Sequence, residues 1–176
     1  MRKEIRIAGS GGQGVILGGI LLSYSIGIFE GLEVVQTQSY GPESRGGACR
    51  AELIVGDEKI DYVKVELPDC FVAMNEISFR KYGMEVKPDS LVIVDSSLVT
   101  IGRTDGSMVR AIPAKWLAEN KLKSYVANMV ILGAFARVAG FVSLRSMIKA
   151  VEQIIPAKHQ SINKDALSLG HEWMGG

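Results

Sequence analysis

The chain has 176 residues, of which 47% are hydrophobic and 22% charged, a composition typical of one globular domain and not of a disordered chain. Twenty Lys and Arg against nineteen Asp and Glu leave a formal net charge of +1, so we expect neither a nucleic acid nor a membrane as a partner. The longest apolar stretch, 15–29, contains glycines, serines and a tyrosine and is shorter than the roughly 20 residues of a membrane span. The chain starts directly with a predicted strand, without the apolar core of a signal peptide. We therefore expect a single cytoplasmic domain over residues 1–176.

The two cysteines, Cys49 and Cys70, are too few and too far apart for a zinc or iron–sulfur site, which needs about four close ligands. We expect both to be buried thiols in strands. His159 and His171 stand alone in the sequence and fit surface or helix-end positions. We expect no metal ligand on this chain.

The first third of the chain is predicted to form a strand, a tight turn and a helix. Residues 5–8 are apolar, four glycines follow within 9–14, and apolar residues then recur at helical spacing up to 29. A second strand is predicted at 33–37, followed at 39–47 by a loop rich in glycine and polar residues. Both loops should lie at the carboxyl edge of the sheet.

The remaining elements alternate between strands and helices. Strands are predicted at 49–55 and 59–65 as a hairpin with its turn at 56–58, then at 69–74, 91–95 and 108–112. Helices are predicted at 76–82, after Pro113, at 128–139, at 143–155 with Ser143 as cap, and at 161–173. This order predicts a Rossmann-like three-layer α/β fold, with a mostly parallel sheet, an antiparallel hairpin and helices on both faces.

The glycine turn is the first candidate site. Glycine removes the β-carbons that keep a ligand at a distance, and the N–H groups of the following helix favour an anion. The spacing Gly9-x-Gly11-x-x-Gly14 also matches the dinucleotide fingerprint, with Glu33 as the acid for a ribose. A free-standing NAD- or FAD-binding oxidoreductase is therefore the alternative function, although the loop at 39–47 differs from the usual end of a ribose-binding strand.

Three motifs in the same order resemble the gamma subunit of the 2-oxoacid:ferredoxin oxidoreductases, and they are the sequences GSGGQGV at 9–15, YGPESRGG at 40–47 and NMVILGA at 128–134. The resemblance covers almost the whole chain. It implies a component of a complex that oxidatively decarboxylates 2-oxoacids to acyl-CoA and passes the electrons to ferredoxin. The second motif favours the pyruvate and 2-oxoglutarate branch, and the third is similar to the 2-oxoglutarate type.

The resemblance also implies cofactors and partners. Thiamine diphosphate and the iron–sulfur clusters belong to alpha, beta and ferredoxin-like delta subunits, and this chain helps to present coenzyme A. The isolated chain should be inactive, with no catalytic residue of its own. The candidate cofactor-binding residues are Gly11, Gly12, Gln13, Gly14, Tyr40, Arg45, Gly46, Gly47 and Asn128.

Each of these side chains also has a purely structural interpretation. Arg45 could donate to a phosphate or carboxylate, or pair with Glu43 within the chain. Tyr40 could pack over the Gly-Pro pair that follows it, and Asn128 could be the N-cap of its helix, which we expect, or a ligand contact. Asp95 ends the strongest strand and could bond its own turn. Valine at the glycine turn is expected to disturb ligand approach or assembly more than folding.

Overall fold

A computed structural model describes residues 1–40, 48–101 and 107–176. The strands are β1 (Arg2–Ser10), β2 (Glu33–Tyr40), β3 (Ala48–Gly56), β4 (Cys70–Ala73), β5 (Leu91–Asp95) and β6 (Met108–Ile112). The helices are α1 (Val15–Tyr24), the π-helical turn η1 (Ser25–Phe29), α2 (Glu76–Tyr82), α3 (Ala114–Lys121), the 3-10 turn η2 (Ser124–Val126), α4 (Ala127–Ala139), α5 (Leu144–Ile154) and α6 (Ala157–Gly175).

The six strands form one sheet in the order β2-β3-β1-β4-β5-β6. Strands β1, β4, β5 and β6 pair in parallel, whereas β3 pairs antiparallel with both β1 and β2. Five strands therefore point the same way, and only β3 runs against them. The predicted mostly parallel α/β fold is confirmed.

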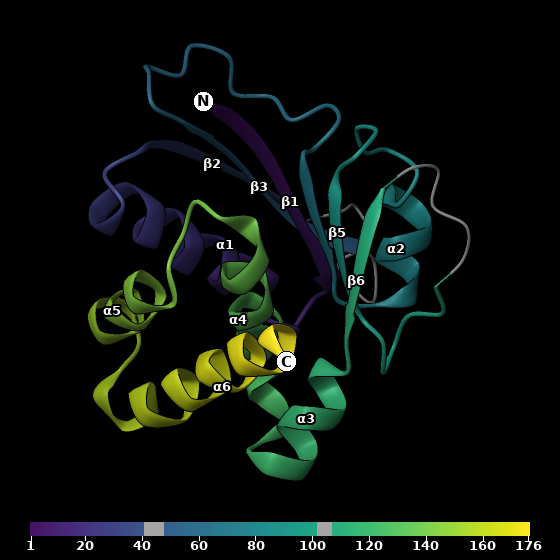
Figure 1. Ribbon diagram of the computed structural model, residues 1–176, viewed down its shortest axis with the longest axis vertical. Coiled ribbons are helices and arrows are strands. Elements are labelled where there is room, and N and C mark those ends of the chain that lie inside the picture. Colours follow the sequence, from purple (N-terminus) through teal and green to yellow (C-terminus); the bar gives the residue numbers. More distant parts are fainter. Residues whose placement is uncertain (41–47, 102–106) are drawn as a thin grey trace.

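Helices cover both faces of the sheet, but unequally. Figure 1 shows α1, α4, α5 and α6 on one face and the short α2 on the other. The side chains of each strand alternate between two cores accordingly. Ile5, Ile7 and Val72 contact the large helical layer, while Ala8 and Phe71 contact the residues around α2. None of the helices in the described ranges has both the length and the apolar character to cross a membrane.

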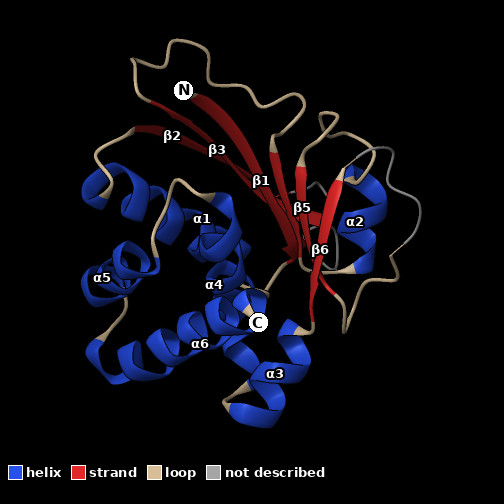
Figure 2. Ribbon diagram, viewed as in Figure 1, coloured by secondary structure: helices blue, strands red, loops and turns tan. Residues whose placement is uncertain are grey.

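The predicted hairpin at 56–58 is wrong. The described secondary structure has no strand at 59–65 (Figure 2). Strand β3 pairs instead with the strand that precedes it in the sequence, β2, and with β1. Residues 57–69 instead connect β3 to β4 without regular secondary structure, and Val65 is buried within this segment. Apolar residues alternate in this segment as they do in a strand, so periodicity alone could not separate the two.

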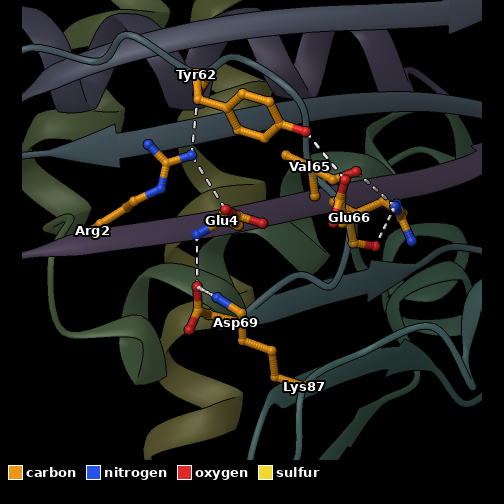
Figure 3. Close-up of polar contacts among 8 residues, drawn as sticks. Arg2, Glu4, Tyr62, Val65, Glu66, Asp69 and Lys87 are labelled. Carbon is orange, nitrogen blue, oxygen red and sulfur yellow. Dashed lines mark hydrogen bonds and ion pairs between the residues drawn. The ribbon is translucent and has the colours of Figure 1, made fainter.

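Side chains, and not a strand ladder, fix this segment. The buried guanidinium of Arg6 pairs with Glu52 at 2.7 Å and donates to the carbonyl oxygens of Val65 and Glu66. Figure 3 shows two further contacts, one on each side of Val65 and Glu66. Arg2 donates to the Tyr62 carbonyl at 3.1 Å, and Asp69 accepts from the Glu4 N–H at 2.8 Å. A charged strand residue thus supplies hydrogen bonds that sheet pairing would otherwise provide.

Several boundaries differ from expectation by a few residues. The first helix changes to a π-helical turn at Ser25, β2 extends through Tyr40, and α6 starts after Pro156, four residues earlier than predicted. The cap of α5 is confirmed, because Ser143 Oγ accepts the Ser146 N–H at 3.1 Å. The cysteines are buried in β3 and β4, and burial raises the pKa of Cys70 to about 12, so its thiol is inert at neutral pH.

Candidate functional site

The glycine turn lies at the carboxyl edge of the sheet, where β1 ends at Ser10 and α1 begins at Val15. Gly12 and Gly14 have φ angles of +87° and +76°, which non-glycine residues rarely adopt. A β-carbon on Gly14 would also collide with the side-chain nitrogen of Asn128. Gly11 has neither constraint, because its φ is not positive and a β-carbon there would meet nothing within 4 Å.

The side chain of Gln13 fixes the shape of the turn. Its Oε1 accepts from the Ser10 N–H at 2.7 Å and from Asn75 Nδ2 at 2.8 Å, and its Nε2 donates to the Met74 carbonyl at 3.1 Å. Asn75 Nδ2 also donates to Ser10 Oγ at 2.6 Å. The side chain of Gln13 thus binds the turn after β1 to the end of β4.

Asn75 was not among the predicted site residues. Its Oδ1 accepts the Ser78 N–H at 2.8 Å and caps α2, while its Nδ2 holds the glycine turn. The sequence carried one signal for it, because an Asn directly before an acidic residue and a helical segment is a typical N-cap. Its second contact, with a turn more than 60 residues away, had no local signal.

The predicted capping role of Asn128 is wrong. Helix α4 begins one residue earlier, at Ala127, and continues from η2, so Asn128 lies inside the helical segment. Its side chain is 6% exposed and points at the glycine turn, with Nδ2 donating to the Gly14 carbonyl at 3.4 Å. The alternative, a ligand contact, stays a prediction, and the side chain is placed against the glycine turn.

Two hollows open beside the turn. The sheet-edge hollow, of about 250 Å³, is lined by Gly12, Gln13, Met74, Asp95, Lys115 and Asn128, among others. The helix-start hollow, of about 510 Å³, is lined by Gly12, Gly14, Tyr125, Asn128, Pro156 and His159, among others. Gly12, Tyr125 and Asn128 border both hollows, so together they form one cleft at the edge where parallel α/β sheets bind ligands.

Asp95 is the acidic side chain in the sheet-edge hollow, and it is 3% exposed. Its carboxylate accepts from the Ser97 N–H at 3.0 Å and from the Lys115 N–H at 2.9 Å. Burial raises the pKa of Asp95, although these backbone donors act in the opposite direction. The expected bond to its own turn is confirmed, and the same carboxylate also caps the start of α3.

The second predicted loop can be placed only by its flanks. Tyr40 ends β2 opposite Cys49, and Ala48 pairs with Ser10 at the end of β1. Arg45, Gly46 and Gly47 lie outside the described residues, as does Glu43. Ala48, the first described residue after this motif, thus lies at the edge that carries the glycine turn.

The geometry argues against the dinucleotide alternative. Strand β3 separates β2 from β1, and Glu33 pairs with Gly56, which in turn pairs with Arg2 at the start of β1. Eight residue steps along β1 then separate this level from Ser10, a distance of roughly 26 Å at about 3.3 Å per residue. Glu33 is therefore at the opposite end of the sheet from the turn.

The chain matches the family model described as pyruvate ferredoxin/flavodoxin oxidoreductase over residues 4–173. It belongs to this family. A 2-oxoglutarate synthase subunit KorC from Methanothermobacter marburgensis is 44% identical, covering 98% of this chain and 96% of the relative. The crystal structure of a keto/oxoacid ferredoxin oxidoreductase gamma subunit from Geobacter sulfurreducens PCA is 35% identical, with a TM-score of 0.89 over 98% of this chain and 95% of that one.

A more distant member shows the same fold within a longer chain. The 2-oxoglutarate:ferredoxin oxidoreductase from Magnetococcus marinus, described with 2-oxoglutarate, coenzyme A and succinyl-CoA bound, is 22% identical with a TM-score of 0.88. It covers 99% of this chain, which matches 31% of the longer one. The family membership expected from the three motifs is confirmed, and the oxidoreductase family fold accounts for the whole described chain.

Proposed function

We propose that this chain is the gamma subunit of a 2-oxoglutarate:ferredoxin oxidoreductase and that its cleft presents coenzyme A to partner subunits. The observation that carries the substrate assignment is the 44% identity, over nearly the full length of both chains, to a subunit named for 2-oxoglutarate synthase. The complex would oxidatively decarboxylate 2-oxoglutarate to succinyl-CoA and CO₂ and reduce ferredoxin. Thiamine diphosphate, iron–sulfur clusters and the catalytic residues would reside on alpha, beta and ferredoxin-like delta subunits, in the cytoplasm.

The cleft supports a coenzyme A role by its chemistry. The exposed glycines Gly11 and Gly12 let a ligand approach the backbone closely, and the start of α1 favours an anionic group. Lys115 adds a cationic side chain to the sheet-edge hollow. Coenzyme A, with its anionic pyrophosphate and its uncharged, partly apolar arm, matches a cleft that joins backbone donors to apolar walls. In this proposal Gly12, Gln13, Gly14 and Asn128 line the site, Gly11 lies next to it in the exposed turn, and Tyr40, Arg45, Gly46 and Gly47 complete it.

The test uses the complex reconstituted from this chain and its partner subunits. Gly11→Val adds a side chain on the exposed turn at a position with no positive φ and no clash, so the variant should fold. It should raise the KM for coenzyme A in 2-oxoglutarate-dependent ferredoxin reduction at least about threefold, while the KM for 2-oxoglutarate stays the same. Arg45→Ala should act in the same direction. Ser161→Val, on the exposed part of α6, is the matched control.

Two results would contradict the proposal. One is turnover of 2-oxoglutarate by the purified chain without partners. The other is an unchanged KM for coenzyme A in both Gly11→Val and Arg45→Ala. Tight, saturable binding of NAD or FAD by the chain would favour the dinucleotide-binding alternative.

A further inference from the structure

The two edges of the sheet differ in how they are protected against the addition of another strand. Figure 2 shows the edge strands β2 and β6 on opposite sides of the sheet. Strand β6 is five residues long and has the exposed, charged Arg110 at its centre, and both properties hinder strand addition. Strand β2 is eight residues long, contains neither proline nor lysine, and has its one charged residue, Glu33, at its start. The β2 edge is therefore the one suited to pairing with a further strand.

The backbone groups that β2 leaves unpaired follow from the alternation of hydrogen bonds along a strand. The Asp69 N–H donates to the Glu4 carbonyl, so the even-numbered residues of β1 direct their backbone groups toward β4. The odd-numbered residues of β1 then face β3, and β3 presents its even-numbered residues to β2. The residues of β2 that direct their N–H and C=O groups away from the sheet are thus Val34, Gln36 and Gln38. No other backbone group in the described chain pairs with them.

Helix α1 lies over β3 and over the edge strand β2 itself. A β-carbon on Gly19 would come within 2.7 Å of the Ala51 side chain and 3.0 Å of the Gln36 side chain, so a larger residue there would push the helix off the sheet. Ser23 Oγ also donates to Gln36 Oε1 at 2.9 Å. The glycine therefore lets α1 pack closely beside the free edge.

The side of α1 that faces away from the other helices is apolar and exposed. Gly18 lies against Leu132 of α4, and Ile20, two residues further along, lies about 200° around the helix from it. Ile20 is 40% exposed. No charged residue occurs at 7–29, a range that includes all of α1 and η1. A helix without a polar face is normally buried on all sides, so the exposed side of α1 indicates a protein partner next to β2.

A second copy of the chain supplies partners for the strand and for the helix in one symmetry operation. A two-fold axis perpendicular to the sheet pairs β2 antiparallel with its own copy and keeps both α1 helices on the same face. Because the outward-facing residues are even-numbered, the register that opposes Gln36 to its own copy pairs Val34 with Gln38. Glu33 opposes Ser39 in this register, so no like charges meet.

The two α1 helices would also come close to each other across the axis. Adjacent strands lie about 4.8 Å apart, so helices that cover β2 and β3 in each copy have their axes roughly 10 to 15 Å apart. Packed helices lie at about the lower end of this range. The Ile20 side chains of both copies point into the space between the helices and lose their exposure to water there.

We propose that the free edge of β2 and the adjoining apolar side of α1 form a self-association surface, through which two copies of this chain join their sheets into one. None of the residues that line the two hollows of the cleft lies on β2. The surface is therefore separate from the proposed coenzyme A site, and the two proposals can fail independently.

The experiment is sedimentation velocity of the full chain over concentrations up to about 100 µM, at which dimers should form. Ile20→Lys places a charge on the apolar side of α1, and Gln38→Pro removes an outward-facing N–H without removing a bond to β3. Each should raise the Kd of the dimer at least about tenfold. Ile77→Lys, the same substitution at an exposed isoleucine of α2, is the matched control and should dimerise like the unmodified chain. The melting temperature of the dilute variants checks that each one is folded.

Amide hydrogen exchange of the same samples locates the contact. Exchange at 33–39 should slow as the concentration rises, while exchange at 108–112 in β6 stays the same. A dimer that both β2-side variants weaken, that Ile77→Lys leaves intact and that protects 33–39 supports the proposal. A chain that stays monomeric at about 100 µM, as expected if only a different subunit covers β2, would overturn it. Equal weakening by Ile77→Lys, or a dimer without added protection at 33–39, would overturn it as well.

Discussion

The helix starts at the helix-start hollow and the other helix starts differ in how they are capped. At α2 and α5, the sequence supplies Asn75 and Ser143 as caps, as a helix that serves only the fold would require. At α1 and α6, the preceding residues are Gly14 and Pro156, which offer no side-chain acceptor. One chain thus caps some helix starts with its own side chains and leaves the starts of α1 and α6, which border the helix-start hollow, without a side-chain cap.

The difference has an energetic consequence. A side-chain cap stabilises a protein by about 1 kcal/mol. The starts of α1, of η2–α4 and of α6 have no side-chain cap, so together they lack roughly 3 kcal/mol of folding free energy that caps would supply. That is a substantial part of the roughly 5 to 15 kcal/mol by which a domain is stable. An anion bound at these helix starts would stabilise the folded state, because a ligand that binds only the folded state shifts the folding equilibrium toward it.

The largest expected effect lies in the turn that opens α1. The expectation that valine disturbs folding little is wrong for Gly14, because Gly14→Val combines a positive φ with a collision against Asn128. It should lower the free energy of unfolding by about 3 kcal/mol or more. Gly11→Val has neither problem and should stay within about 0.5 kcal/mol of the unmodified chain. Urea unfolding of both variants checks the difference. Equal losses of unfolding free energy in the two variants would contradict the difference in backbone conformation and space between Gly11 and Gly14.

The next effect concerns a capped start. Asn75→Ala removes the cap of α2 and the two hydrogen bonds to Ser10 and Gln13, so we expect a loss of about 2 kcal/mol. The control is Asn120→Ala, an exposed asparagine whose side chain, within the part of the chain that the structure describes, donates only to the Trp116 carbonyl. Thermal or urea unfolding measures both, and a loss below about 0.5 kcal/mol for Asn75→Ala would contradict the assigned contacts.

A smaller, pH-dependent effect is expected at the start of α5, where Glu30 accepts the Ser143 N–H at 2.8 Å. Burial is the largest influence and would raise the pKa of Glu30, but hydrogen bonds from Ser146 and Ser143 outweigh it and lower the pKa below 4.5. The carboxylate therefore stabilises the fold above that pH and loses this contribution as the pH falls through its lowered pKa. Glu30→Gln should be less stable than the unmodified chain at pH 7, and the difference in the free energy of unfolding should shrink as the pH falls below 4.5. A difference that does not change with pH below 4.5 would rule out the charge as its cause.

The sequence predicted what depends on local pattern. The strand, glycine turn and helix at the start of the chain, the cap at Ser143 and the strand ending at Asp95 were all found where expected. The fold class followed from the alternation of strands and helices. These features rest on residues that are close in the sequence.

What the sequence could not predict depends on distant contacts. Residues 57–69 alternate like a strand, but the Arg6 guanidinium holds them in place from β1. In the sequence, Asn128 stands before an apolar run as a helix cap does. In the structure its side chain donates to the carbonyl of Gly14, more than 110 residues away. Tyr125 and His159 join the cleft only because η2 and the start of α6 lie beside the glycine turn in the fold, which no local pattern in either segment encodes.

Amide hydrogen exchange of the full chain, read by mass spectrometry with and without coenzyme A, tests the contrast between the two groups of helix starts most directly. We expect coenzyme A to slow exchange at 11–17, 124–128 and 157–159, and to leave 76–79 and 144–147, at the capped starts of α2 and α5, unchanged. Protection confined to the capped starts, or no change at the three open ones at saturating coenzyme A, would contradict the claim that the open starts form the ligand site.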